Sequence, residues 1–320
     1  TQELDQPLVQ FGYDIFTSVP TTFALVTNVP VPADYRLAAG DTLIVQLYGK
    51  RNVEYTLVVT REGKLLIPEY GPLTVAGMTF GEAREAIAEG FQQRVIGARA
   101  VVTMGELRSL QVRLTGDVNK PGVYTISALS GLVDALLVTG GIKYTGSLRD
   151  IQVKRRGELV ARFDLYDLLL RGDTAADITL KHNDVIFVPP IGDVVYVGGE
   201  VQRPGIYELH GESTVAEALG LAGGLTASAS LVDSVIERVI PGRYRTLVSL
   251  ARSKPGAESI EAGDFLRILP VDDTLDAVVL LSGHVKRPGG YQLRNGMRVS
   301  QLVPDARMLL PNADLDFALV

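Results

Sequence analysis

The chain has 320 residues, of which 46% are hydrophobic and 21% charged, and its net charge is −6. This composition is typical of folded protein and, at this length, of two to four domains. The acidic balance and the lack of a basic block argue against nucleic-acid binding. No apolar run reaches the roughly 18 to 20 residues of a membrane-spanning helix. The chain has no cysteine, which excludes disulfides, thiolate nucleophiles and cysteine-ligated zinc.

Residues 1–34 are rich in proline, threonine and valine and show no sustained period. Proline removes backbone donors and disfavours a helix before it. We expect either an extended arm or linker, laid over a neighbouring domain, or a disordered leader. No basic, apolar signal peptide begins at Thr1, so we expect a mature or trimmed fragment.

Residues 35–106 predict a small α+β domain. Thr79 and Glu82 form a capping-box pattern before a helical segment, whose apolar residues recur every fourth position. The expected elements are strands over 43–47 and 100–104, a hairpin of 55–60 with 64–68, and a helix from Thr79 to about Gln93 that buries Ala83, Ile87 and Phe91.

A cassette of the form Gly-x-Val-x-Lys/Arg-Pro-Gly-x-Tyr occurs three times, beginning at Gly116, Gly199 and Gly283. The spacings of 83 and 84 residues indicate an internal repeat. An alternating apolar run before each cassette predicts a strand. The Pro-Gly pair predicts a type II turn, in which the glycine accepts a positive φ. Each cassette therefore predicts a β-hairpin.

Two complete repeats, 107–190 and 191–271, predict the same order of elements: a hairpin, a helix, a second hairpin, a short helix and a closing strand. In each, a glycine doublet (Gly140–Gly141, Gly223–Gly224) is expected to end the first helix in a left-handed conformation. The helix over 130–139 is expected to bury Val133, Leu136 and Leu137. One helix across a small mixed sheet is the β-grasp arrangement, so the chain predicts an α+β fold with tandem β-grasp repeats.

The remaining segment, 272–320, predicts a partial third repeat. It has a hairpin cassette and a helix start near Arg298, but Arg307 stands where the glycine doublet is expected. The segment is therefore either cut short or degenerate.

The residues resemble a known family. Tyr35, Gly40–Asp41, the turn at 61–63 and the Thr79 helix resemble the N-terminal domain of bacterial polysaccharide export proteins of the Wza type. The three cassettes and two glycine doublets resemble the soluble-ligand-binding β-grasp (SLBB) repeats of that family. The resemblance covers about 35–320.

Membership would imply a periplasmic component of a translocon for capsular polysaccharide or exopolysaccharide. Several copies would form or line a ring-shaped conduit that docks on an inner-membrane synthesis and export partner. The chain departs from the family in lacking a lipidated cysteine, and Arg298–Val320 has no amphipathic character typical of a pore-forming helix. Outer-membrane association is therefore expected only through segments outside this chain.

Catalytic chemistry is not indicated. His182, His210 and His284 are the only histidines, and they lie in separate repeats without metal-ligand spacing. Asp41, Asp184 and Asp264 recur in similar turns, where Asx-turn capping explains an aspartate better than catalysis. We therefore expect no enzyme, no cofactor and no metal site.

The best binding candidates are the cations and tyrosines of the hairpins. Cations can pair with an acidic glycan and tyrosine can stack on a sugar ring, or the same surface can contact a neighbouring subunit. Alternatively, the tyrosines are core or cross-strand residues and the cations are only solvated. The candidates are Lys120, Tyr124, Arg203, Tyr207, Lys286, Arg287 and Tyr291.

Three functions stay open at this point. The favoured one is a non-enzymatic component of polysaccharide export. The second is a glycan-binding or scaffold module that does not itself transport. The third, a polysaccharide-modifying enzyme, would need a pair of carboxylates about 5 to 9.5 Å apart in a cleft.

Overall fold

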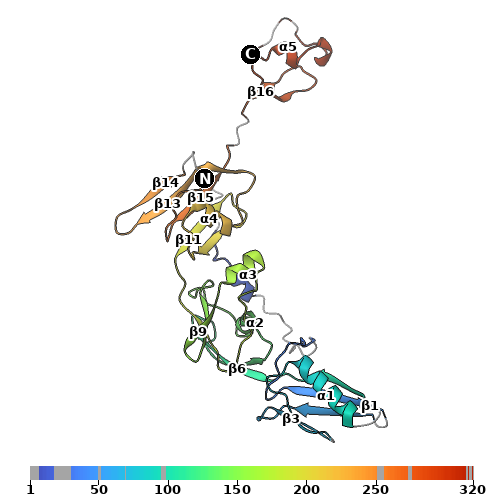
Figure 1. Ribbon diagram of the computed structural model, residues 1–320. Helices are drawn as coiled ribbons and strands as arrows, with labels where there is room; N and C mark the ends of the chain where they lie inside the picture. Colours follow the sequence, from blue (N-terminus) through green and yellow to red (C-terminus); the bar gives the residue numbers. More distant parts are fainter. Residues whose placement is uncertain are drawn as a thin grey trace. The chain divides into compact units, whose positions relative to one another are not determined.

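The computed structural model describes residues 7–17, 30–49, 52–68, 70–94, 99–250, 256–272, 276–314, 316 and 319. The chain divides into two compact units, Thr1–Leu269 and Pro270–Val320. Both contain helices and strands, with four sheets described in the larger unit and one two-stranded sheet in the smaller, so the predicted α+β class is confirmed (Figure 1).

A three-stranded antiparallel sheet, in the order β2-β1-β5, forms the first part of the larger unit. Helix α1 (Phe80–Arg94) lies across this sheet and buries Ala83, Ile87 and Phe91 completely, as predicted (Figure 1). The capping box also forms, because the Thr79 N–H donates to Glu82 at 2.8 Å and the Glu82 N–H to the Thr79 hydroxyl at 3.2 Å. The strands of this part are β1 (Thr42–Tyr48), β2 (Val53–Val58), β3 (Lys64–Ile67), β4 (Gly71–Thr74) and β5 (Arg99–Met104).

The hairpin predicted for 55–60 with 64–68 is wrong. Strand β2 pairs with β1, and β3 pairs with β4 in a separate two-stranded sheet. Two backbone bonds hold the end of β2 on the start of β1: the Val59 N–H donates to the Asp41 carbonyl at 2.8 Å, and the Gly40 N–H to the Val59 carbonyl at 2.9 Å. Local alternation identified both strands but not their partners.

Two five-stranded mixed sheets follow, with the same topology. The repeat-1 sheet has the order β7-β6-β10-β8-β9, and the repeat-2 sheet β12-β11-β15-β13-β14. In each, the first and closing strands are parallel and a hairpin flanks either side, which is the β-grasp arrangement that the sequence predicts. The repeat-1 strands are β6 (Ser109–Gly116), β7 (Gly122–Ser127), β8 (Ile151–Arg155), β9 (Glu158–Phe163) and β10 (Val185–Val188). The repeat-2 strands are β11 (Val194–Gly199), β12 (Gly205–Glu208), β13 (Ala229–Ile240), β14 (Tyr244–Ser249) and β15 (Phe265–Pro270).

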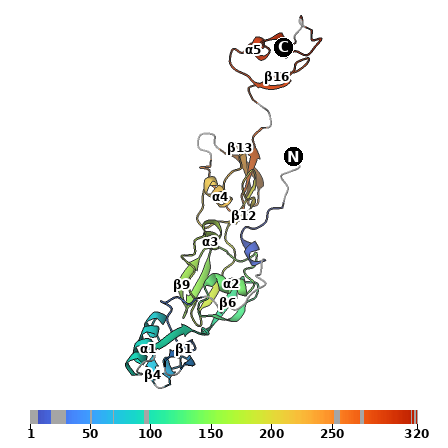
Figure 2. The ribbon, with the colours of Figure 1, turned by 90° about the vertical axis from the view of Figure 1, so that its right-hand side faces the viewer.

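Three short helices accompany these sheets: α2 (Leu132–Val138), α3 (Leu165–Arg171) and α4 (Val215–Leu221) (Figure 2). Helix α2 buries Leu132, Ala135 and Leu136, so Leu136 of the predicted stripe is buried, whereas Val133 and Leu137 are half-buried. At the start of the helix, after Gly131, the Asp177 carboxylate accepts the Leu132 N–H at 2.7 Å. The glycine doublets have the predicted left-handed φ, between 79° and 89°.

The first cassette glycine of each complete repeat has a specific structural role. Gly116 and Gly199 both have φ of 86°, and a Cβ added at either would overlap the carbonyl oxygen of the closing strand, at Val188 and Ile268 respectively. Glycine is therefore required by a close backbone approach. The predicted type II turn is wrong, because Gly122 has φ of 159° rather than about +80°.

The smaller unit contains β16 (Val278–Leu281), β17 (Gly289–Gln292) and α5 (Val299–Leu302). Its cassette loop is held as in the other repeats, because the Lys286 N–H donates to the Met308 carbonyl at 2.8 Å, as Asn119 does to Gly141 at 3.0 Å. A 3-10 helix over Ala306–Met308 occupies the place of the missing glycine doublet. The partial third repeat therefore keeps this contact with a different local structure.

Candidate functional site: the hairpins and the junction of the repeats

Each cassette tyrosine closes its own hairpin loop. The hydroxyls of Tyr124, Tyr207 and Tyr291 donate to the carbonyl oxygens of Lys120, Arg203 and Arg287, at 2.7, 2.5 and 2.7 Å. Tyr207 is completely buried, and the other two tyrosines are half-buried. Burial raises the pKa of Tyr207 above its ordinary value, which keeps its hydroxyl a proton donor. These tyrosines therefore have a structural role that accounts for their recurrence.

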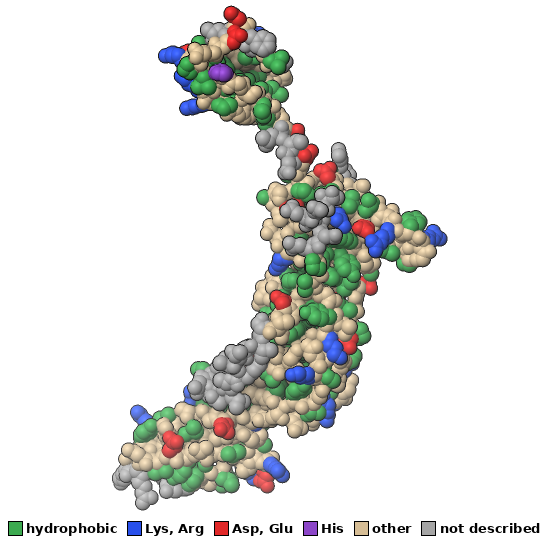
Figure 3. Space-filling model, turned by 180° about the vertical axis from the view of Figure 1, so that it is seen from behind, with side chains coloured by type: hydrophobic (Ala, Val, Ile, Leu, Met, Phe, Trp, Pro, Cys, Tyr) green, Lys and Arg blue, Asp and Glu red, His purple; other side chains and the backbone are tan. Residues whose placement is uncertain are grey.

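The hairpin cations lie on three separate loops, two in the larger unit and one in the smaller. Lys120, Lys286 and Arg287 are exposed. Arg203 is exposed too, and its guanidinium lies 5.5 Å from the centre of the Phe11 ring. On the face drawn in Figure 3, the described Lys and Arg side chains are interspersed with Asp, Glu and apolar ones. Contact of these cations with a glycan or a subunit stays a prediction.

An N-terminal segment, residues 8–16, packs on both repeats. The Ile206 N–H donates to the Val9 carbonyl at 2.9 Å and the Phe11 N–H to the Ile206 carbonyl at 3.0 Å, which adds a parallel strand segment to the edge of β12. The Phe11 ring meets Tyr166 edge-on at 5.1 Å and stacks on Tyr207 at 5.2 Å. This arm thus joins side chains of the two repeats through one aromatic cluster.

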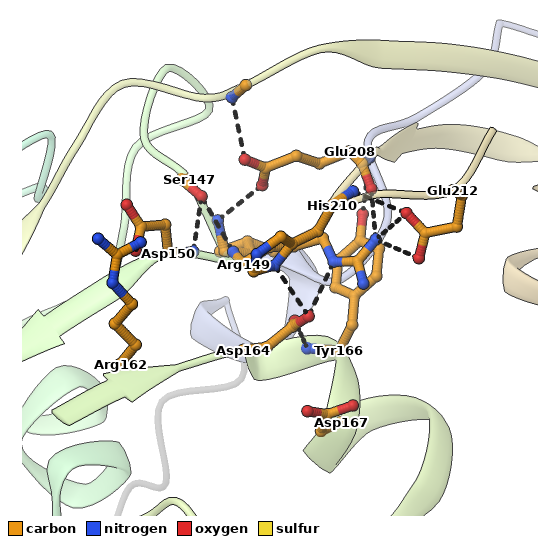
Figure 4. Close-up of polar contacts among 12 residues, drawn as sticks. Ser147, Arg149, Asp150, Arg162, Asp164, Tyr166, Asp167, Glu208, His210 and Glu212 are labelled. Carbon is orange, nitrogen blue, oxygen red and sulfur yellow. Dashed lines mark hydrogen bonds and ion pairs between the residues drawn. The ribbon is translucent and has the colours of Figure 1, made fainter. Parts of the chain in front are cut away.

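A buried arginine joins the two repeats directly (Figure 4). Arg149, with 6% of its side chain exposed, lies before β8. It donates to Asp164 at 3.0 Å, and to the Glu208 carbonyl and both Glu212 carboxylate oxygens at 2.9 Å. Its guanidinium also lies 4.7 Å from the centre of the Tyr166 ring. Burial opposes the charged form, but Asp164 and Glu212 raise the pKa of Arg149, so it stays a cation.

Glu208 completes this junction from the edge strand of the second repeat. Its buried carboxylate accepts the Leu148 N–H at 3.0 Å and the Gly192 N–H at 2.9 Å. Its own N–H donates to the Tyr166 hydroxyl at 3.1 Å. Buried polar groups of each repeat are therefore hydrogen-bonded to partners in the other repeat. These bonds hold the two repeats in one relative orientation.

The recurring aspartates of the turns are structural. Asp41, Asp184 and Asp264 are fully buried. One carboxylate oxygen of each accepts, at 2.8 Å, the N–H three residues before it, which is the expected turn capping. Each also pairs with an arginine from another segment: Arg108, Arg155 and Arg238, at 2.6 to 2.8 Å. These carboxylates are thus held by cations and main-chain donors.

Sequence reasoning missed Arg149, Glu208 and Glu212. Arg149 is 59 to 63 residues away from its partners in the second repeat, so no short motif joins them. Within the described ranges, no group of three or more His, Asp or Glu side chains could hold a metal ion, and no helix is long and apolar enough to cross a membrane.

The fold is that of a modular α+β protein in which tandem β-grasp repeats follow a small α+β domain, and comparison with known proteins identifies the family. The polysaccharide biosynthesis/export protein family matches residues 29–105. The SLBB domain family matches residues 110–188, 194–249 and 278–316. The chain therefore belongs to the polysaccharide export proteins that carry SLBB domains.

Two curated proteins are similar to part of the chain. The chain is 33% identical over 177 residues to the "EPS I polysaccharide export outer membrane protein EpsA" of Ralstonia solanacearum, covering 54% of this chain and 47% of that protein. It is 30% identical over 218 residues to the "Polysialic acid transport protein KpsD" of Escherichia coli, covering 66% and 38%. The matched region thus spans less than half the length of either relative.

Proposed function

We propose that this chain is a periplasmic, outer-membrane-associated component of a capsular polysaccharide or exopolysaccharide translocon, in which several copies form or line a conduit. The observation that carries the proposal is the order of its domains, one polysaccharide biosynthesis/export domain followed by SLBB domains. Two relatives that this chain matches are named as a polysaccharide export protein and a polysialic acid transport protein. The polymer, further copies of the chain and an inner-membrane synthesis and export partner are the proposed partners.

The junction between the repeats supports a role as a rigid building block of the conduit. Arg149 and Glu208 are buried between the repeats with their polar groups paired, and the arm is bonded to β12. Paired buried groups cost free energy to separate, which favours a rigid body over two repeats on a flexible linker. The proposed domains are 1–34 (arm), 35–106 (export domain), 107–190 and 191–271 (repeats) and 272–320 (partial repeat).

The proposed conduit is not an enzyme. The buried turn aspartates are neutralised by arginines, so they do not offer the free pair of carboxylates that glycoside hydrolysis needs. The exposed hairpin cations, Lys120, Arg203, Lys286 and Arg287, would contact polymer or a neighbouring copy.

The mass of the native full-length protein, extracted from the envelope and measured by light scattering, tests the conduit. The proposal predicts one closed oligomer of defined mass that persists on dilution. A monomer that binds glycan would contradict it and favour the second candidate, a glycan-binding or scaffold module. The recurrence of the β-grasp repeats is the observation that keeps this second candidate open.

A further inference from the structure

The outer face of the repeat-1 sheet, opposite the buried side chains of Val112, Val153 and Ile186, carries cations without matching carboxylates. Strand register places Arg113, Val185 and Lys154 side by side in one row across β6, β10 and β8. The next row contains Thr115, Phe187 and Gln152. These six residues define what we call the cationic face.

Phe187 holds the lysine of this face in place. The Lys154 ammonium lies 4.6 Å from the centre of the half-buried Phe187 ring. Such a cation–π contact restrains the flexible side chain while leaving the ammonium open to solvent on its other side. Among the described residues, no carboxylate lies within ion-pair distance of Lys154 or Arg113. Asp150, two residues before Gln152, is bonded to Arg162 at 3.0 Å and to Gln152 at 2.7 Å.

The repeat-2 sheet provides an internal comparison. Lys154 precedes Arg155, which pairs with Asp184, and Glu237 precedes Arg238, which pairs with Asp264. Glu237 therefore takes the position of Lys154. It pairs with Arg245 at 3.0 Å and lies 3.8 Å from Arg267, so the second sheet balances its charges internally.

From this contrast we infer that the cationic face of the repeat-1 sheet is a contact surface for an acidic polysaccharide. Lys154 and Arg113 flank β10, two strand spacings or about 10 Å apart. This separation lets the two cations reach carboxylates on different sugars of one extended chain. In the next row the Thr115 hydroxyl donates to the Ile186 carbonyl at 3.4 Å and the Gln152 amide to Asp150 at 2.7 Å, which leaves their oxygens to accept from sugar hydroxyls. The inference rests on the proposed function, which supplies polysaccharide as the ligand. Beyond that function, it names the surface that binds the polymer and the acidic class of that polymer.

Binding of the full chain to polygalacturonate, an acidic polymer, and to dextran, a neutral one, tests this inference. We expect polygalacturonate to bind more tightly than dextran, with an affinity that falls as salt is added. The double variant R113Q/K154Q should weaken polygalacturonate binding about tenfold, because two exposed ion pairs are lost. Lys154→Arg should retain binding.

A matched control removes the same two charges elsewhere. R243Q/R245Q changes exposed cations at the tip of the β13–β14 hairpin, and polygalacturonate affinity should stay within about twofold. Equal loss in both double variants would overturn the inference, because it would show unspecific attraction. Unchanged polygalacturonate binding in R113Q/K154Q would also overturn it. If that variant changed the oligomeric mass but not the binding, the face would be a subunit contact and the inference would again be wrong.

The export role is tested separately. Loss of surface polymer on gene deletion does not depend on which face binds it, so failure of the cationic face leaves the proposed function standing. Binding at this face without any effect of gene deletion on surface polymer would support the inference and contradict the proposed function.

Discussion

Replacing Arg149 with methionine removes the charge that joins the two repeats while keeping most of the apolar volume. The change leaves Asp164 and Glu212, whose side chains are 14% and 15% exposed, without their cation. It also leaves the Glu208 carbonyl without a donor and removes the cation above the Tyr166 ring. Separation of the repeats at this junction should therefore become easier.

Removing one partner of a buried ion pair costs about 3 to 5 kcal/mol. Water can reach the partly exposed carboxylates of Asp164 and Glu212, so we expect the lower end, about 3 kcal/mol. Opening of the junction should then become roughly a hundredfold more frequent.

Hydrogen exchange of the full chain measures this opening at residues 147–150 and 208–212. Arg162→Met is the matched control, because Arg162 is 59% exposed and its pair with Asp150 is worth less than about 1 kcal/mol. The reasoning is refuted if Arg149→Met accelerates exchange no more than Arg162→Met does.

Other changes test other parts of the structure. Gly199→Ala should destabilise the chain by about 3 kcal/mol or more in urea unfolding, because its Cβ overlaps the Ile268 carbonyl. Gly283→Ala, at φ of 106° with open space around it, should cost only about 1 kcal/mol, and equal losses would contradict this account. Phe11→Ala should release the arm and expose it to limited proteolysis at a cost of about 2 kcal/mol, whereas Val9→Ala, at a side chain 66% exposed, should leave cleavage unchanged. Burial opposes ionisation of Glu212, but main-chain N–H groups and Arg149 lower its pKa below 4.5. The stability it provides should be present at neutral pH and lost as pH falls through that lowered value. The thermal unfolding midpoint checks this, and a Glu212→Gln variant with an undiminished acid-induced loss would refute it.

Hydrophobic alternation and helix-capping patterns in the sequence predicted several strands and one helix start, because these features depend on residues close together in the chain. Alternating apolar residues indicated β1, β6 and β11, and the Thr79 capping box indicated the start of α1. The repeat spacing singled out the cassette glycines, but it did not show why glycine is required at these positions. Glycine is needed at Gly116 because β10 approaches there, a contact between residues 72 positions apart that the sequence does not display.

Side-chain contacts between the repeats could not be predicted either, because the contacting residues are far apart in the sequence. Nothing adjacent to Arg149 indicates that it meets Glu212, and the expectation for residues 1–34 left an arm and a disordered leader open. The pairing of Phe11 with Tyr166 and Tyr207 depends on how two repeats meet. The charge contrast between Lys154 and Glu237 became visible only after strand register aligned the two sheets.

The central claim is that this chain takes part in moving polysaccharide to the cell surface. The most direct test is to delete its gene in the source bacterium, restore it, and measure polymer outside and inside the cell. The account predicts that surface polymer disappears on deletion, polymer of unchanged linkage is retained inside, and restoration returns it to the surface. Surface polymer that persists in the deletion strain, or polymer of altered linkage, would contradict it.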